Sequence, residues 1–336
     1  MRKAFVLAAV MTALLCGCAA VPAPSASPET PSLVNIGGIE LTPGEMRYLV
    51  AEAAGMGSEE IDWDGTVDGV PARRFILDEA LSMAVSSYTT GVKAAELGFS
   101  LTDEEKSEIE WEITLYAEYK GGREAFLAWL SDSGLTEERY RFYNYEAPLY
   151  QKKMIEGLYG PGGIYEPGEQ TERTFFSEHY LSASYIYILG VDDHGEPLTG
   201  ELYQTQKNIA DALRRQAVAG EDFTELVETH GQDYLMSLSP EGRTVPRGEL
   251  SEVAESALTA LAEGGISETV EADGGFYILK RLPIDWEWFE KNREDVWYIC
   301  AEDAYYRQLA EWSAAVETRV SDEYYRLDPQ EWIAVG

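Results

Sequence analysis

The spacing of apolar residues changes twice along this chain, and these changes limit the folds that it can adopt. Between residues 33 and 160, apolar side chains recur three and four positions apart, which predicts helices. Residues 185–189 form an aromatic and β-branched run that predicts a strand, and residues 276–279 predict another. After Pro283 the helical spacing returns. We therefore expect an α+β part between two helical parts.

Local signals mark where some of these elements begin. In residues 42–45, and again in residues 102–105, a threonine stands three positions before a glutamate, which is the pattern of a capping box. Both sites are therefore predicted helix starts. Before the first of them, residues 34–41 predict a short hairpin or a bent strand.

The first 17 residues have the form of a signal peptide. Two basic residues precede the apolar run 4–15, which is too short to span a bilayer. Positions 15–18 read Leu-Cys-Gly-Cys and resemble the lipobox of bacterial lipoproteins, which implies cleavage before Cys18 and lipidation of Cys18. An ordinary signal peptide is the alternative. We expect an extracytoplasmic protein anchored to the membrane, with residues 18–32, rich in Pro, Ser and Ala, as a flexible tether.

The formal net charge of −34 limits the possible partners. A carboxylate-rich surface repels phosphate, which argues against nucleic acid as a partner. The acidic surface is expected mainly to keep the protein soluble, and attraction of basic clients or of cations is the alternative. The three histidines, His179, His194 and His230, lack the spacing of metal ligands, so neither a metal nor a cofactor is expected.

The order of the three parts resembles that of the PrsA-type lipoprotein folding factors and of periplasmic SurA. Residues 94–105 resemble the link between two chaperone helices in that family. The resemblance implies a helical chaperone domain over 33–160, a linker over 161–180 and an inserted parvulin-like α+β domain over 181–284. Residues 285–336 would form a C-terminal helix that completes the chaperone domain.

Motifs of the inserted part resemble those of parvulin-type prolyl isomerases, but the family's two histidines are replaced. Tyr185 follows Ala-Ser where the family has Ala-Ser-His, and Tyr277 stands in the closing motif where the family has Gly-Tyr-His. Asp233 is a candidate for the family's Cys or Asp. The resemblance implies a substrate-binding pocket formed by Leu250, Val253, Leu258 and Phe276.

The replacements bear on isomerase activity. An isomerase lowers a barrier of roughly 20 kcal/mol to rotation about the peptide bond by favouring the twisted imide. A tyrosine offers one hydroxyl and cannot replace the two nitrogens of an imidazole. We therefore expect a weak or inactive isomerase in which Tyr185 and Tyr277 are core aromatics. An active isomerase that uses the altered residues is the alternative.

Aromatic residues suggest the second activity that the resemblance implies, the binding of unfolded exported polypeptides. The chain contains 21 Tyr and 8 Trp, and such side chains combine an apolar body with a polar tip. The candidates for contact with clients are Trp111, Tyr116, Tyr119, Trp129, Tyr140, Tyr143 and Tyr145. Two further alternatives are a solute-binding lipoprotein and a scaffolding lipoprotein with one dedicated partner.

Overall fold

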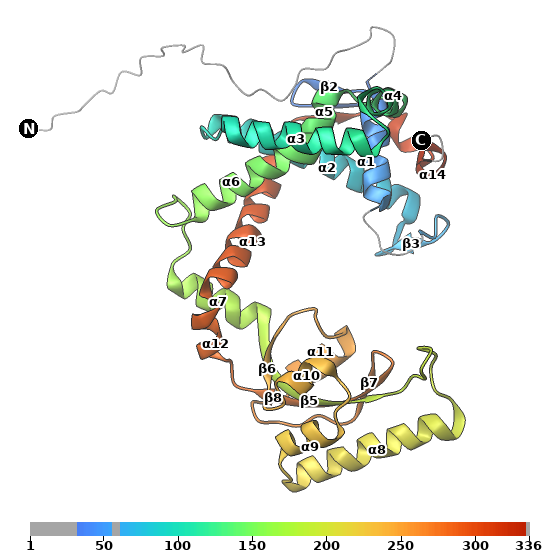
Figure 1. Cartoon of the computed structure of the whole chain (residues 1–336), viewed down its shortest axis with the longest axis vertical. Helices are drawn as coiled ribbons and strands as arrows, with labels where there is room; N and C mark the ends of the chain where they lie inside the picture. The colour runs from blue at the N-terminus through green and yellow to red at the C-terminus, as the bar shows by residue number, and fades with distance from the viewer. Residues whose placement is uncertain (1–31, 56–60, 334–336) are drawn as a thin grey trace, which may run out of the picture. The chain divides into compact units, whose positions relative to one another are not determined.

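The computed structural model describes residues 32–55 and 61–333, which divide into two compact units (Figure 1). Unit 1 combines Met1–Glu166 with Glu302–Gly336, and unit 2 is Pro167–Ala301. The predicted signal peptide, the predicted lipidation site Cys18 and the tether up to residue 31 lie outside the described residues. Within the described residues, every helix falls short of the length or the apolar character needed to cross a membrane.

Unit 1 is mostly helical, as the apolar spacing predicts. Both predicted capping boxes are formed: in the second, Thr102 Oγ1 accepts a hydrogen bond from the Glu105 amide, and the Glu105 carboxylate accepts one from the Thr102 amide. The helices are α1 (Pro43–Gly55), α2 (Ala72–Glu96), α3 (Asp103–Tyr119), α4 (Arg123–Ser133), α5 (Glu137–Arg141), the π-helix η1 (Phe142–Glu146), α6 (Ala147–Tyr159), the 3-10 helix η2 (Tyr324–Arg326) and α14 (Pro329–Ile333).

The C-terminal segment joins unit 1 through a strand that the sequence does not reveal. The predicted hairpin forms as β1 (Val34–Ile36) and β2 (Ile39–Leu41), and β9 (Thr318–Val320) pairs antiparallel with β1. The resulting sheet has the order β2-β1-β9. A second, two-stranded ladder consists of β3 (Thr66–Val67) and β4 (Val70–Pro71).

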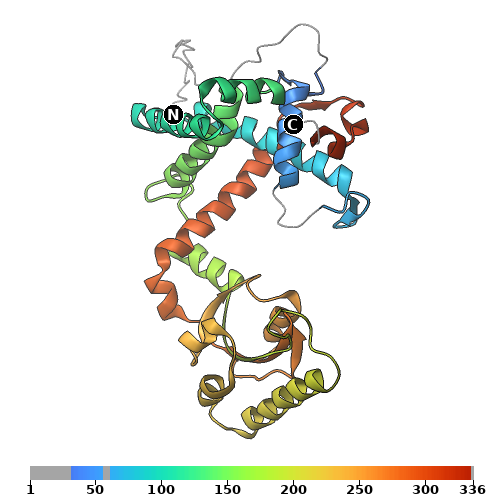
Figure 2. The same cartoon turned by 45° about the vertical axis from the view of Figure 1, so that its right-hand side comes forward.

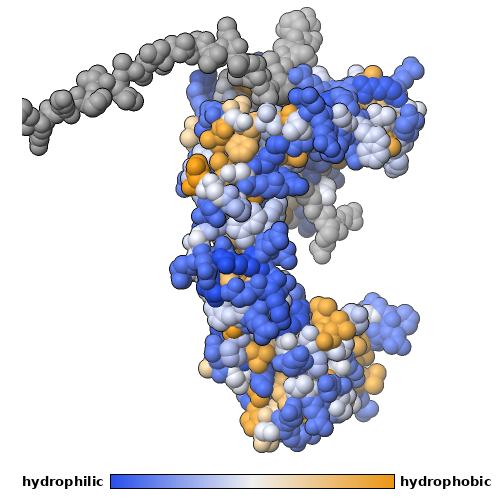
Figure 3. Space-filling model, turned by 60° about the vertical axis from the view of Figure 1, so that its left-hand side comes forward, coloured by the Kyte–Doolittle hydropathy of each residue, from blue (hydrophilic) through white to orange (hydrophobic). Residues whose placement is uncertain are grey.

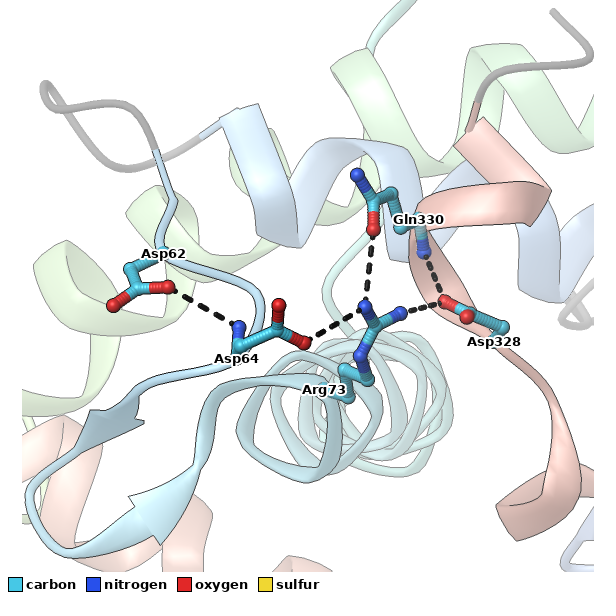
Figure 4. A network of polar contacts seen from close by, with 5 residues as sticks. All are labelled: Asp62, Asp64, Arg73, Asp328 and Gln330. Atoms are coloured by element: carbon cyan, nitrogen blue, oxygen red, sulfur yellow. Dashed lines mark hydrogen bonds and ion pairs between the residues drawn. The ribbon is translucent and has the colours of Figure 1, made fainter.

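Side-chain contacts attach the end of the chain to helix α2. The Tyr324 hydroxyl is fully buried and donates to the carbonyl of Leu77 at 2.7 Å. The Arg73 guanidinium contacts the Asp328 carboxylate and donates to Gln330 Oε1 at 3.1 Å, while Asp64 lies on its other side at 3.4 Å (Figure 4). Residues 324–330 are thus part of the fold of unit 1.

Unit 2 is built on a four-stranded antiparallel sheet with the order β6-β5-β8-β7. The predicted strands form its centre, β5 (Tyr180–Leu189) and β8 (Gly275–Leu282), and the edges are β6 (Arg243–Pro246) and β7 (Val270–Ala272). Two helices, α8 (Gly200–Ala219) and α9 (Phe223–His230), lie on one face of the sheet, and α10 (Tyr234–Leu238) and α11 (Glu252–Thr259) lie on the other (Figures 1 and 2).

The unit boundaries differ from those expected from the sequence. In place of a linker over 161–180, the structure has helix α7 (Glu169–His179), and residues 285–301 belong to unit 2. These residues include α12 (Trp286–Lys291) and the start of α13 (Arg293–Ala314). The reason is a separate apolar cluster in which Phe175, Phe176 and Tyr180 pack with Phe289, Val296 and Cys300. Helical spacing alone does not tell which partner a helix packs against.

Candidate functional site

Strands β5 and β8 bring together Tyr185 and Tyr277, the two tyrosines predicted to stand at the positions of the parvulin histidines. Tyr187 lies directly opposite Tyr277, and Tyr185 lies opposite Leu279. Because alternate strand residues share a face, Tyr185, Tyr187 and Tyr277 point to the same side of the sheet. The ring centroids of Tyr185 and Tyr277 are 5.4 Å apart, edge to face, and those of Tyr187 and Tyr277 are 4.6 Å apart. We call these three residues the tyrosine cluster.

The hydroxyls of the cluster are held by neighbouring loops. Tyr185 donates to Asp233 Oδ1 at 3.1 Å, and the same oxygen caps helix α10 by accepting from the Met236 amide at 2.8 Å. Tyr187 donates to the backbone carbonyl of Asp273 at 2.5 Å. The structure therefore brings the candidate Asp233 to Tyr185.

Tyr187 and Asp273 were missed by the sequence reasoning, although both carry a signal. Tyr187 stands two positions after Tyr185 in a strand, so the two share a face. Asp273 and Gly274 have φ angles of 53° and 70° and form the two-residue loop between β7 and β8. An Asp-Gly pair with positive φ at both positions is the signature of a tight hairpin turn. This turn places the Asp273 carbonyl beside the tyrosine cluster.

Burial raises the pKa values of the phenols in the cluster further above neutral pH. Desolvation raises the pKa of Tyr185 to about 12, and the negative charge of Asp233 adds to this increase. Desolvation also raises the pKa of Tyr277, with a further contribution from Asp273. The ordinary pKa of an imidazole is about 6.5, so the side chains of a histidine pair can gain and lose protons near neutral pH. The tyrosine cluster is uncharged there and offers only fixed hydroxyl groups.

The predicted pocket residues are not gathered into one open surface. Leu250 and Leu258 are buried in the core of unit 2, and Leu258 has no exposed surface. Val253, on helix α11, is 57% exposed. Phe276 precedes Tyr277 in β8 and therefore faces the opposite side of the sheet, where its ring packs against Tyr203 of α8 with the centroids 5.4 Å apart.

Unit 1 contains a second candidate site, a groove between α3 and the segment formed by η1 and α6. Its volume is about 630 Å³. Its lining includes Ile109, Trp111, Tyr145, Pro148 and Leu149. The groove is mainly apolar, and we call it the α3–α6 groove. Apolar patches also stand out on the otherwise hydrophilic surface of the units (Figure 3).

The aromatic residues predicted to contact clients fall into two groups. Trp111 is 60% exposed and Tyr119 is 82% exposed, and both lie on α3. Tyr140 is buried, and Tyr116 packs against it with the ring centroids 5.9 Å apart. Trp129 belongs to the same packed cluster, whereas Tyr143 and Tyr145 are partly exposed. The side chains most available to a client are therefore Trp111 and Tyr119.

Within the described ranges, no three His, Cys, Asp or Glu side chains are grouped so as to hold a metal ion. The two candidate sites present apolar and aromatic side chains, hydroxyls and carboxylates, together with the Asn144 amide and the Lys152 ammonium group in the groove.

Comparison with known proteins gives one family match. Residues 194–282 match the family model of the PPIC-type PPIase domain, a rotamase. This range covers most of unit 2, including Tyr277, and begins nine positions after Tyr185. No curated protein matches the chain.

Several solved structures are similar to this chain at low identity. PrsA of Bacillus cereus is 15% identical over 90% of this chain and 98% of its own, with a TM-score of 0.36. A SurA-like chaperone of Campylobacter jejuni is 11% identical over 87% of this chain and 99% of its own, with a TM-score of 0.32. The parvulin of Nitrosopumilus maritimus is 21% identical over 31% of this chain and 97% of its own, with a TM-score of 0.24.

Proposed function

We propose that the protein is a lipid-anchored extracytoplasmic folding factor of the SurA/PrsA type. Residues 194–282 match the PPIC-type PPIase domain and lie in unit 2, which is inserted between the two segments of the helical unit 1, in agreement with the fold class and the resemblance predicted from the sequence. Unit 1 binds unfolded exported polypeptides, and the PPIC-type domain of unit 2 has weak or no isomerase activity. The observation that carries the proposal is the buried tyrosine cluster.

The geometry of unit 2 supports the proposal that its isomerase activity is weak or absent. Tyr185, Tyr187 and Tyr277 are 2%, 9% and 7% exposed, so their rings fill the space above the central strands. The hydroxyls of Tyr185 and Tyr187 are already engaged by Asp233 and Asp273. A proline ring needs open apolar surface, and the fully buried Leu258 offers none. The region around the tyrosine cluster is therefore packed like the core of a protein.

A refolding assay limited by proline isomerisation tests this part of the proposal. The mature chain should accelerate refolding far less than an intact parvulin at the same concentration. Tyr277→Ala is the companion variant, because it removes a ring from the cluster. Acceleration equal to that of the intact parvulin, abolished in Tyr277→Ala, would show that the tyrosines support catalysis.

An active isomerase is the second candidate, and one observation favours it. The hydrogen bond from Tyr185 to Asp233 links two elements in the manner of a polar network, at 3.1 Å. Tyr185→Phe removes this bond and leaves the ring. If the protein is an active isomerase, this variant loses activity while its fold is unchanged.

The α3–α6 groove supports binding of unfolded polypeptides. Chains in transit expose apolar segments that aggregate, and an open apolar groove covers such segments without reading their sequence. The volume of about 630 Å³ is in the range of ligand sites, which is roughly 300–1,000 Å³. Trp111 at this groove and Tyr119 further along α3 add exposed aromatic surface.

Suppression of aggregation tests the second part. The mature chain should reduce light scattering by an unrelated protein diluted from denaturant, and Trp111→Ala combined with Tyr119→Ala should weaken this effect. Leu202→Ala on α8 is a matched control, since Leu202 is exposed but lies in unit 2. Unchanged scattering with the wild-type chain would contradict polypeptide binding.

Membrane anchoring rests on the sequence of residues 1–18. Cys18→Ala should move the protein from the membrane fraction to the soluble extracytoplasmic fraction and abolish labelling by a fatty-acid analogue. Retention in the membrane without label would show that another segment holds the protein there.

A further inference from the structure

The lining of the α3–α6 groove combines apolar side chains with two carboxylates, those of Glu108 and Glu112, that form no ion pair with any described residue. We propose that this groove selects polypeptide segments in which an apolar or aromatic anchor is flanked by lysine or arginine. The inference rests on the proposed binding of unfolded polypeptides and adds the charge of the segment that is bound.

The apolar part of the groove is suited to one or two side chains of a client. Ile109 of α3 is buried, and Leu149 of α6 is partly exposed beside it in the lining. Trp111 contributes a ring that is 60% exposed. An exposed tryptophan contributes a large contact area at low cost in conformational entropy, which makes it an effective anchor for a partner.

Two carboxylates of the lining are uncompensated. Glu108 and Glu112 lie four positions apart on α3, so they are neighbours on one helix face. Both are exposed, and neither forms an ion pair with any residue in the ranges 32–55 and 61–333. Like charges at this spacing destabilise a helix slightly. A cation that binds between them relieves this repulsion.

Two neighbouring carboxylates of α3 are paired with cations of the protein. Glu105, also in the lining, binds Lys153 at 2.6 Å, and Glu110 on the same helix binds Arg141 at 2.5 Å. The cation of the lining is Lys152, and it lies 3.9 Å from Glu156 rather than beside Glu108 or Glu112. Glu108 and Glu112 are therefore available to pair with a cationic side chain of a client that enters the groove.

The opposite wall of the groove includes an unusual backbone. Asn144 and Tyr145 belong to the π-helix η1, a form that is rare and is frequently found at functional sites. Asn144 fixes this turn by donating to the Tyr140 carbonyl at 2.8 Å and accepting from the Tyr48 hydroxyl at 2.9 Å. The wall facing α3 is therefore held in place before a client arrives.

Charge complementarity decides among the possible occupants. A second copy of this chain has a net charge of −34 and is repelled by the carboxylates, as is an anionic lipid surface. An apolar segment without charge leaves Glu108 and Glu112 uncompensated at its edge. A segment with an apolar anchor and basic flanks can contact the apolar lining and also pair with Glu108 and Glu112.

Fluorescence anisotropy with two labelled peptides tests the proposal on the mature chain. The peptides share one apolar core that contains an aromatic residue, and they differ in having two flanking lysines or two flanking glutamates. At low salt the lysine peptide should bind roughly tenfold more tightly, since each of two exposed ion pairs adds a few tenths to about 1 kcal/mol. Added salt should reduce the difference because exposed charges are screened.

A matched pair of double variants separates the groove from the overall charge. Glu108→Gln with Glu112→Gln should reduce the preference for the lysine peptide to about twofold. Glu104→Gln with Glu118→Gln removes the same charge from the same helix outside the lining and should keep the preference. Equal losses in both double variants would overturn the proposal in favour of a general effect of net charge.

The remaining outcomes distinguish this inference from the proposed function. Equal binding of both peptides, weakened by Trp111→Ala, would overturn the charge preference and leave polypeptide binding intact. If neither peptide binds and aggregation is not suppressed, both proposals are wrong. Tighter binding of the lysine peptide that depends on Glu108 and Glu112 supports both.

Discussion

The tyrosine cluster of unit 2 and the α3–α6 groove of unit 1 use similar residues in opposite ways. In the cluster, the rings are buried and the hydroxyls of Tyr185 and Tyr187 have hydrogen-bond acceptors. In the groove, Trp111 is exposed and Glu108 has no ion-pair partner among the described residues. Aromatic content alone therefore does not identify a binding surface. The two regions differ in whether the aromatic rings are buried and the polar groups have hydrogen-bond or ion-pair partners within the fold.

The largest expected effect comes from removing a ring of the cluster. Tyr277→Ala should lower the free energy of unfolding of unit 2 by about 3–5 kcal/mol, because it deletes a buried aromatic side chain and leaves a cavity. Trp111→Ala should change the free energy of unfolding of unit 1 by less than about 0.5 kcal/mol, since that ring is exposed. Urea denaturation followed by circular dichroism measures both. Similar losses would remove the distinction between the two regions.

A smaller effect is expected at the edge of the cluster. A Cβ added at Gly275 would lie 2.5 Å from the Ile188 carbonyl oxygen and 2.5 Å from Cζ of Tyr187. Gly275→Ala should therefore destabilise unit 2 by about 1–3 kcal/mol through overpacking. Gly168→Ala is the control, because nothing lies within 4 Å of a Cβ there, and it should cost only a few tenths of a kcal/mol to about 1 kcal/mol, since Gly168 is the N-cap of α7. If both variants have the same denaturation midpoint, the cluster is less tightly packed than its geometry indicates.

Alkaline pH should destabilise the cluster. The pKa of Tyr185 is raised to about 12 in the folded protein, above its ordinary value of about 10. The stability that comes from the protonated phenol is fully present below about pH 10 and is lost as the pH rises through 12. Tyr185→Phe should reduce this loss by roughly 1–2 kcal/mol in unfolding measurements between pH 8 and 12. The exposed Tyr119→Phe should follow the wild-type curve.

The smallest expected effect compares two acids of the groove. Glu108→Gln should leave stability unchanged or raise it by about 0.2–0.5 kcal/mol, because it removes repulsion from Glu112. Glu105→Gln should lower stability by about 1 kcal/mol, because the Glu105 carboxylate binds Lys153 and caps α3. Thermal unfolding resolves the difference. A loss at Glu108 as large as that at Glu105 would mean that Glu108 has a structural role.

Local signals in the sequence predicted much of the fold. The central strands β5 and β8, the hairpin of residues 34–41 and the two capping boxes follow from residue order within a few positions. The meeting of Tyr185 and Tyr277 followed from the resemblance to parvulins, because it fixes which strands are neighbours. Each of these features depends on short-range chemistry or on a known strand order.

Contacts between distant residues could not be predicted in the same way. Strand β9 has only three residues, and its partner β1 is more than 280 positions earlier. Phe276 was expected in the pocket, but the alternation of side chains along β8 turns it to the other face. The glutamates of the α3–α6 groove can be read from the sequence. Only the structure shows which of them have no ion-pair partner among the described residues.

The pairing of β1 with β9 affects the order in which the two units can complete their folding. Unit 2 is one continuous stretch, Pro167–Ala301, whereas the sheet of unit 1 requires the third strand at residues 318–320. A chain synthesised from its N-terminus can therefore complete unit 2 while the sheet of unit 1 still lacks its third strand. Until residues 318–320 are available, the edge of β1 that pairs with β9 is exposed, and an exposed strand edge promotes aggregation.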